Sequence, residues 1–175
     1  MTTHTTPTTD TTGTGDLLTW GQVSARAGRN EMPALLVANL HRMPLDEIRH
    51  AVDAAWRMAE WPEPHLGREA WIGLFDGCGY MVDGEPHLRS TDLPEYVTLY
   101  RGAGPGRRRG MSWTSSLEQA AWFAYRFDVN ATARVYTARV HRSQVLARIT
   151  ERAEDEYVVD TTELDDRDIT IHPGD

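Results

Sequence analysis

The chain has 175 residues, of which 40% are hydrophobic and 25% charged, a composition that suits one globular domain with one core. Its 26 acidic residues exceed the 18 Lys and Arg residues, and the resulting net charge of -8 argues against a nucleic-acid partner. Cys78 is the single cysteine and the histidines lack metal-ligand spacing, so we expect no metal site. The sequence holds neither a secretory signal nor ~18 consecutive apolar residues, so we expect no membrane contact. We therefore expect a cytoplasmic protein, in the producing or target cell.

The N-terminal part, residues 17–85, is expected to be mainly helical. Residues 1–16 are mostly Thr with Gly, Pro and Asp, which predicts a disordered tail, and residues 17–30 favour a short helix. A longer helix is predicted after Pro44, because apolar residues then recur at helical spacing: Ile48, Ala51, Val52, Ala55, Trp56 and Ala59. The Trp-Pro-Glu-Pro segment at 61–64 should stop this helix, and residues 66–76 should form a shorter one that is ended by Gly77 and Gly79.

The aromatic residues of this helical part recur at the spacing of core residues. They are Trp56, Trp61, Trp71 and Phe75. Aromatic side chains at helix spacing are usually buried between elements, so we assign them no chemistry.

The C-terminal part, residues 86–175, is expected to form a sheet, because short β-branched or aromatic runs alternate with Gly, Pro and Asn. The predicted strands cover residues 96–101, 111–114, 134–140, 156–160 and 169–172. Ser115 and Glu118 have capping-box spacing, and the helix that follows should bury Leu117, Ala120, Ala121 and Ala124. The sequence thus predicts an α+β fold in one domain, residues 17–175, with the N-terminal helices packed against a mainly antiparallel sheet.

A glycine-rich run at 102–106 follows the first of these strands. Such a run could cradle a phosphate in a dinucleotide-binding fold, but a helix would then have to begin directly after it. Arg107, Arg108 and Arg109 and a Trp-containing strand follow instead, which favours a flexible turn. The arginines could touch a phosphate or could be solvated, and the sequence leaves their role open.

Two short strands carry polar residues that could hold a ligand. Alternation places Val97, Leu99 and Arg101 on one face of the first strand, so that a cation ends an apolar row. Arg101 could bind a diphosphate by bidentate hydrogen bonds or could form an ordinary ion pair. Ser112 and Thr114 share a face of the second strand, where they could orient a ribose or simply lead into the next helix.

A pair of carboxylates opens the strand at 156–160. Glu154 and Glu156 are two residues apart and project to the same side. One carboxylate could stabilise a developing positive charge while the other positions or deprotonates a nucleophile. Taken alone, the pair could equally be a solvated acidic loop.

The order of these segments resembles that of one enzyme family. The C-terminal half contains, in this order, a strand that ends in Tyr-Arg-Gly, a Ser-x-Thr strand, an Ala-rich helix with Trp-Phe-Ala at 122–124, and a Glu-x-Glu at the start of a later strand. This order resembles that of the arginine-serine-glutamate class of ADP-ribosyltransferases, as in phage and bacterial toxins. The resemblance covers the C-terminal half and includes residues 135–138 and 145–147. It implies a split mixed sheet with a cleft for NAD, which is a co-substrate.

The resemblance also assigns residue roles. Arg101 matches the family arginine that binds the NAD phosphate, and Glu156 matches the catalytic glutamate. Ser112 matches the first serine of the family's Ser-Thr-Ser motif, while Trp113 and Thr114 depart from its second and third residues, although Thr114 keeps a hydroxyl. Residues expected to touch or shape the NAD site are Tyr100, Gly102, Ser112, Thr114 and Phe123.

The expected reaction follows from these roles. Glu156 would stabilise the oxocarbenium-like cation that develops when the nicotinamide–ribose bond breaks, and Ser112 would orient Glu156 or the ribose. In this family Glu at the place of Glu154 accompanies transfer to arginine, so a protein arginine is the expected acceptor. The alternatives are an NAD glycohydrolase, with water as acceptor, and a non-catalytic interaction module with the same fold.

Overall fold

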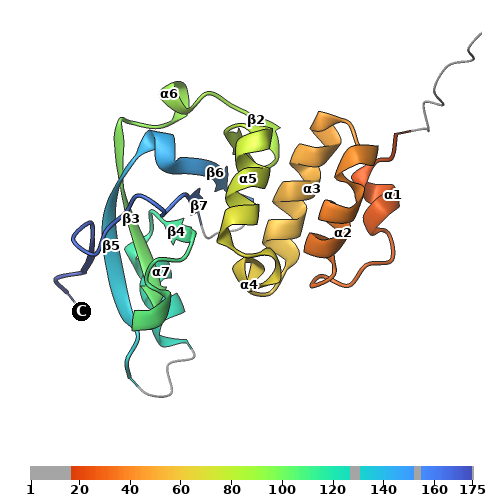
Figure 1. Ribbon diagram of the computed structural model, residues 1–175. Coiled ribbons are helices and arrows are strands. Elements are labelled where there is room, and N and C mark those ends of the chain that lie inside the picture. Colours follow the sequence, from red (N-terminus) through yellow and green to blue (C-terminus); the bar gives the residue numbers. More distant parts are fainter. Residues whose placement is uncertain (1–16, 127–130, 152–154, 175) are drawn as a thin grey trace, which may run out of the picture.

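The computed structural model of the protein describes residues 17–126, 131–151 and 155–174. The tail expected at residues 1–16 lies outside these ranges. The fold is α+β: helices α1 to α5 lie side by side at one end of the molecule, and a mixed sheet with helix α7 occupies the other end (Figure 1). No helix in the described ranges is long and apolar enough to cross a membrane.

The helical part contains more helices than the sequence predicts. Its elements are α1 (Trp20–Ser24), α2 (Met32–Asn39), the 3-10 turn η1 (Leu40–Arg42), α3 (Leu45–Met58), α4 (Pro62–Leu66) and α5 (Arg68–Cys78). Helix α3 begins after Pro44 and buries the expected apolar stripe, including Ala51 and Trp56. The predicted helix at 66–76 is α5, which continues past Gly77 and ends before Gly79, whose φ of 73° suits a glycine.

The stop predicted at 61–64 is a turn followed by a helix. Trp61 adopts the left-handed conformation with φ 61°, and α4 begins at the next residue. Pro62 can begin a helix because its missing N–H would have no partner in the first turn. Helix α2 escaped sequence analysis because it is apolar around much of its circumference and no side chain caps its start.

The sheet has eight strands in the order β2-β1-β6-β7-β4-β3-β5-β8. Their bounds are β1 Met81–Val82, β2 Glu85–Pro86, β3 Tyr96–Ala103, β4 Ser112–Thr114, β5 Arg134–His141, β6 Val145–Ile149, β7 Glu156–Val159 and β8 Ile169–Ile171; the short helices α6 Arg89–Asp92, η2 Pro105–Arg107 and η3 Arg142–Gln144 lie between them. Strands β1 and β6 are parallel, and every other neighbouring pair is antiparallel.

All the strands that the sequence predicts are present, with ends that differ by one or two residues. Strand β6 was not predicted as a strand, because its residues are buried on both faces and show no alternation. Strands β3 and β4 share one register pair, Tyr100 with Thr114, whereas β3 and β5 are paired along their whole length. The pairing between β3 and β4, which connects the two sides of the sheet, is therefore much shorter than the pairing between β3 and β5.

Helix α7 (Leu117–Tyr125) begins one residue later than the sequence predicts. Ser116, not Ser115, caps it by accepting a hydrogen bond from the Gln119 backbone N at 3.1 Å, while Thr114 Oγ1 accepts from Ser116 N at 3.1 Å and closes the preceding turn. The expectation that Leu117 is buried is also wrong, since it is 39% exposed. The helix packs through smaller side chains instead, mainly Ala120 and Ala124.

Glycine at position 102 allows α7 to lie directly on β3. A Cβ on Gly102 would stand 1.9 Å from the backbone oxygen of Ala120 and 2.4 Å from the backbone N of Ala124. No side chain fits such a gap, so Gly102 sets the distance between the helix and the strand.

The core consists of a helical side and a sheet side. Trp71 and Phe75 of the helices pack with Leu146 of β6 and with Met111, which precedes β4. The second cluster lies within the sheet part and includes Leu99 and Trp113. The two halves thus share a buried apolar interface along β6 and the start of β4.

Candidate active site

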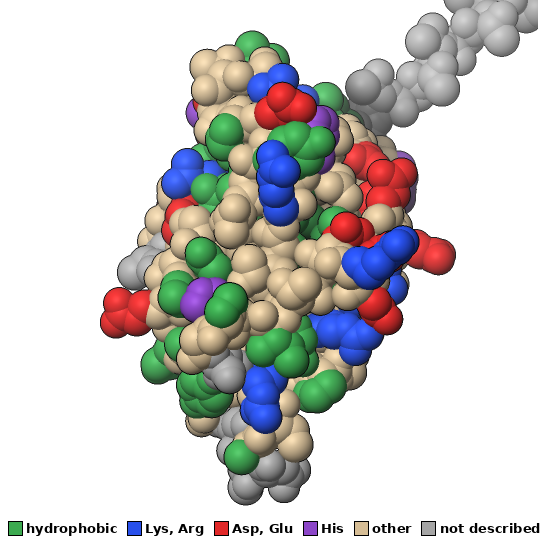
Figure 2. Space-filling model, turned by 90° about the vertical axis from the view of Figure 1, so that its left-hand side faces the viewer, with side chains coloured by type: hydrophobic (Ala, Val, Ile, Leu, Met, Phe, Trp, Pro, Cys, Tyr) green, Lys and Arg blue, Asp and Glu red, His purple; other side chains and the backbone are tan. Residues whose placement is uncertain are grey.

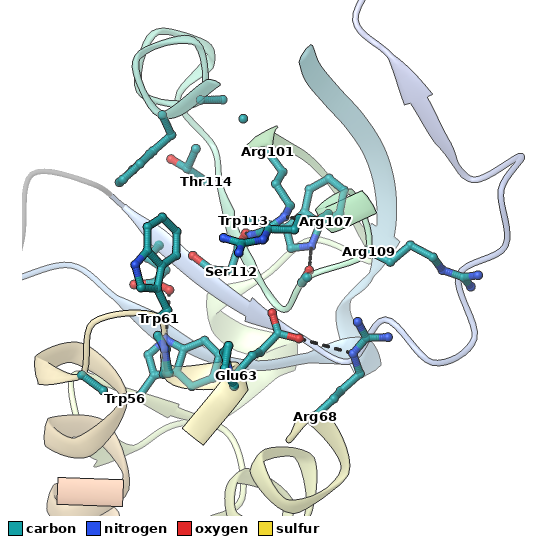
Figure 3. A pocket seen from close by; sticks show the side chains of 18 of the residues that line it. Trp56, Trp61, Glu63, Arg68, Arg101, Arg107, Arg109, Ser112, Trp113 and Thr114 are labelled. Atoms are coloured by element: carbon teal, nitrogen blue, oxygen red, sulfur yellow. Dashed lines mark hydrogen bonds and ion pairs between the residues drawn. The ribbon is translucent and has the colours of Figure 1, made fainter. Parts of the chain in front are cut away.

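A cavity of about 750 Å³ lies where α3 and α4 approach strands β3, β4 and β7 (Figure 3). It gathers the described side chains that the sequence singled out as site residues: Tyr100, Arg101, Gly102, Ser112, Thr114, Phe123 and Glu156. Glu154 lies outside the described residues. The cavity is within the usual size range of small-molecule sites.

Glu156 stands at the start of β7 and faces the helical part. The register places it opposite Thr114 of β4. One of its carboxylate oxygens, Oε1, accepts a hydrogen bond of 2.9 Å from the indole Nε1 of Trp56 at the C-terminal end of α3. Trp56 is 2% exposed and packs edge-on against Trp71 and Phe75. The assignment of Trp56 to the core is correct, but its indole also reaches the candidate catalytic carboxylate, which the sequence did not reveal.

Arg101 links three segments at the inner wall of the cavity. Its Nε donates to the backbone oxygen of Arg107 at 3.0 Å, and its Nη1 donates to the backbone oxygen of Ser112. Two of the guanidinium donors are thus used by backbone oxygens of the loop and of β4. Burial lowers the pKa of the Arg101 guanidinium, and the carboxylates of Glu63 and Glu156 oppose that effect. The group stays protonated at neutral pH, because arginine is never deprotonated in that range.

Gly110 leaves the space that Arg101 occupies. A Cβ at this position would lie 2.2 Å from Nη2 of Arg101 and 2.8 Å from Oε2 of Glu63. A side chain at residue 110 would therefore displace the Arg101 guanidinium and the Glu63 carboxylate from their present positions.

Glu63 connects α4 to β4 and was not identified from the sequence. Its Oε2 accepts a hydrogen bond from the backbone N of Met111 at 3.0 Å, and its Oε1 lies 3.4 Å from Nε of Arg68 (Figure 3). The only signal in the sequence was a glutamate held between two prolines. Periodicity gave no reason to bring that segment next to the sheet.

Ser112 and Thr114 line the cavity as expected from strand alternation. Ser112 is half-buried and Thr114 is buried. Thr114 also receives the hydrogen bond that precedes α7, so one of its roles is local. Trp113 is 1% exposed and donates from Nε1 to the backbone oxygen of Gly110 at 2.8 Å, which fixes the loop against the strand.

The structure separates the three loop arginines whose role the sequence left open. Arg107 and Arg109 line the cavity, and Arg108 pairs with Asp166 at 2.8 Å; Arg109 also lies 3.9 Å from Asp166. The guanidinium carbon of Arg107 lies 5.3 Å from the ring centre of Trp61, which is 59% exposed at the cavity edge. The assignment of Trp61 to the core is therefore wrong: its ring is exposed and contacts Arg107 of the loop instead.

The cavity is lined by more cations than carboxylates. Its arginines are Arg57, Arg68, Arg101, Arg107 and Arg109, and its acidic residues are Glu63, Glu69 and Glu156. On the face of the molecule seen in Figure 2, by contrast, blue cationic side chains are separated from one another by acidic and uncharged ones. Arg57 and Arg68 are ion-paired with carboxylates, so the attraction of the cavity for an anionic ligand such as a diphosphate rests mainly on Arg101 and Arg107.

A buried ion pair borders the cavity on the helical side. Asp53 is 3% exposed, and one of its oxygens lies 2.8 Å from Nη2 of Arg57, which also pairs with Glu151. Burial raises the pKa of Asp53 to about 6, although Arg57 opposes the shift; Asp83 and Glu151 add to it. Arg57 is thereby held in the cavity wall by two carboxylates.

Comparisons with family models, curated proteins and solved structures found no match. Within residues 17–126, 131–151 and 155–174, no group of three His, Cys, Asp or Glu side chains could hold a metal ion. The site is thus defined by its own geometry: a carboxylate with an indole donor, neighbouring hydroxyls, and arginines around them. Such a set can bind an anionic ligand and stabilise a positive charge that develops within it.

Proposed function

We propose that the protein is a mono-ADP-ribosyltransferase that moves ADP-ribose from NAD to an arginine on a target protein and releases nicotinamide. The observation that carries this proposal is the convergence of Arg101, Ser112 and Glu156 from three strands on one cavity. These residues are the ones that the arginine-serine-glutamate order singled out. Their meeting at one place is what a shared function requires.

The residues present suit NAD as a co-substrate. NAD carries two phosphates between two ribose groups, and the cavity offers several guanidinium groups in addition to Arg101. Tyr100, Phe123 and Trp61 supply aromatic surface for flat rings. We assign the diphosphate contact to Arg101, as the resemblance implies, with help from Arg107, whose side chain lines the same cavity.

In the proposed reaction, Glu156 stabilises the ribose as the bond to nicotinamide breaks. A fixed carboxylate interacts more strongly with the cationic transition state than with the ground state, and this difference lowers the barrier. Ser112 orients the ribose or the carboxylate, and the arginines keep the ribose in place by holding the diphosphate.

The acceptor assignment rests on the sequence resemblance at Glu154. A carboxylate attracts a guanidinium and helps to unmask its nitrogen as a nucleophile, which an amide does less well. The net charge of -8 adds a general attraction for cationic peptide segments. With its single cysteine, Cys78, the protein suits a reducing compartment, and we propose the cytoplasm as its site of action.

The proposal is tested by following the label of NAD that is labelled in the adenylate part. The wild-type protein is incubated with labelled NAD, a cell lysate and, separately, the small guanidine agmatine. The proposal predicts label on protein and on agmatine. Label that appears only as free ADP-ribose would identify a glycohydrolase, and unchanged NAD would identify a non-catalytic module.

The Glu154→Gln variant tests the acceptor assignment separately. We expect it to lose transfer to protein and to agmatine while it retains slow hydrolysis of NAD, because Glu156 remains. If both activities disappear together, Glu154 serves NAD itself and the acceptor assignment is wrong.

A further inference from the structure

The hydrogen bond between Trp56 and Glu156 joins residues that are 100 positions apart in the chain. Trp56 belongs to α3 of the helical part, and Glu156 begins β7 of the sheet. The indole N–H of Trp56 donates to Oε1 of Glu156 at 2.9 Å. Trp56, which lines the cavity, therefore contacts the Glu156 carboxylate, the group that the proposed reaction uses.

We propose that Trp56 is a positioning residue, which holds the carboxylate of Glu156 in the orientation that the reaction needs. This inference rests on the proposed function. It deepens that function by assigning the helical part a direct role in the chemistry of the cavity, in addition to covering the sheet.

The surroundings of Trp56 make its indole a fixed donor. The ring is 2% exposed and lies 5.1 Å from the ring centre of Trp71 and 5.5 Å from that of Phe75, at interplanar angles of 87° and 76°. Side chains packed in this way stay in one rotamer. A glutamate side chain has several freely rotating bonds, so a rigid donor at Oε1 removes orientations that would not react.

Trp71 provides a matched control inside the same aromatic cluster. It is fully buried, and its indole N–H donates to the backbone oxygen of Pro62 at 2.8 Å. Replacement of either tryptophan by Phe removes one indole donor and part of one buried ring. Only the replacement of Trp56 removes a donor to Glu156.

The kinetic test compares Trp56→Phe with Trp71→Phe in nicotinamide release from NAD. We expect Trp56→Phe to lower kcat about ten-fold with little change in KM for NAD, because a hydrogen bond to a charged group that orients the carboxylate is lost. The acidic side of its kcat profile should move to higher pH, since the donor favours the charged carboxylate. Trp71→Phe keeps the Trp56 donor and leaves an aromatic ring beside it, so it should lower kcat by less than about two-fold and leave the pH profile unchanged, even if the two variants lose similar stability.

Trp56→His keeps a ring N–H donor at this position. It should retain more of kcat than Trp56→Phe. Equal losses of kcat and equal pH profiles in Trp56→Phe and Trp71→Phe would reduce Trp56 to a packing role and overturn the proposal.

A spectroscopic measurement tests the same contact without NAD. In ¹H–¹⁵N spectra, the indole resonance missing from Trp56→Phe identifies Trp56, and the one missing from Trp71→Phe identifies Trp71. We expect the Trp56 resonance to shift as the pH is lowered and the carboxylate is protonated, and to lose that shift in Glu156→Gln; the Trp71 resonance should be insensitive to that substitution.

The two proposals fail in different ways. A wild-type protein that releases nicotinamide while Trp56→Phe keeps full kcat and the wild-type pH profile would contradict the positioning role alone. A wild-type protein that releases no nicotinamide would contradict the proposed function. The indole titration would then decide whether Trp56 holds Glu156, and a resonance that ignores Glu156→Gln would overturn the inference.

Discussion

The helical part and the sheet part both line the cavity, but they contribute different kinds of groups. The sheet supplies Arg101, Ser112 and Glu156, whose places are set by backbone pairing between strands. The helical part supplies Trp56 and Glu63, each of which reaches across by a hydrogen bond to the sheet half. The sheet thus presents the candidate catalytic groups, and the helical part supplies hydrogen bonds to Glu156 and to the backbone that leads into β4.

The largest expected effect concerns the sheet part alone. Gly102→Ala would place a Cβ 1.9 Å from the Ala120 backbone oxygen, so α7 would have to move away from β3. We expect the free energy of unfolding to fall by at least about 3 kcal/mol. The control is Gly104→Ala, where no atom lies within 4 Å of the added Cβ and the change should stay within about 0.5 kcal/mol. Urea unfolding measures both, and equal midpoints would show that the helix is free to shift.

The second prediction concerns the helical part and its pH dependence. The folded state raises the pKa of Asp53 from 3.8 to about 6, so it binds this proton more tightly than the unfolded chain does. The stability that protonated Asp53 contributes is complete below pH 4 and is lost as the pH rises to about 6, a fall of roughly 2 to 3 kcal/mol. Asp53→Asn should remove this fall in unfolding experiments at a series of pH values.

A sheet-part carboxylate with the opposite shift serves as the control for Asp53. The half-exposed Asp165 pairs with Arg167, which lowers its pKa to about 2. Its contribution is present above pH 4 and is lost only as the pH falls towards 2, so Asp165→Asn should leave the slope between pH 4 and 6 unchanged. If the free energy of unfolding of the wild-type protein does not change between pH 4 and 6, the raised pKa of Asp53 in the helical part is contradicted.

The third prediction separates the inner arginine from the outer one. Arg101→Ala removes a cavity guanidinium with two backbone contacts and should raise KM for NAD about ten-fold, whereas Arg108→Ala removes a cation that pairs with Asp166 and should change KM by less than about two-fold. Equal effects in nicotinamide-release kinetics would move the phosphate contact to the loop.

What the sequence could predict follows the same division between the two parts. Strand alternation marked Arg101, Ser112 and the Glu154–Glu156 pair only as candidates, and the resemblance to the arginine-serine-glutamate class then singled out Arg101, Ser112 and Glu156, which meet at one cavity. These residues are placed by local strand geometry and by pairing between strands whose periodicity is visible. The predicted α+β class and the helix after Pro44 are confirmed for the same reason.

The parts that escaped prediction depend on contacts between distant segments. Trp56 shows ordinary helical periodicity, and nothing near it in sequence reveals that its N–H points at Glu156. Glu63 lies in a segment that was expected only to end a helix, because its two prolines are typical of a helix stop. Proline also occurs in the first turn of a helix, and α4 begins at Pro62. Strand β6 lacks alternation since both of its faces are buried.

The most direct test of the account is nicotinamide release by the wild-type protein and by Glu156→Gln, measured side by side at saturating NAD. Glu118→Gln is the control, because Glu118 is an exposed carboxylate on α7 that does not line the cavity. The account predicts that Glu156→Gln lowers kcat about 100-fold or more with an unchanged unfolding midpoint, since the charge that stabilises the cationic transition state is removed. Release that is as fast in Glu156→Gln as in the wild type and Glu118→Gln would contradict it.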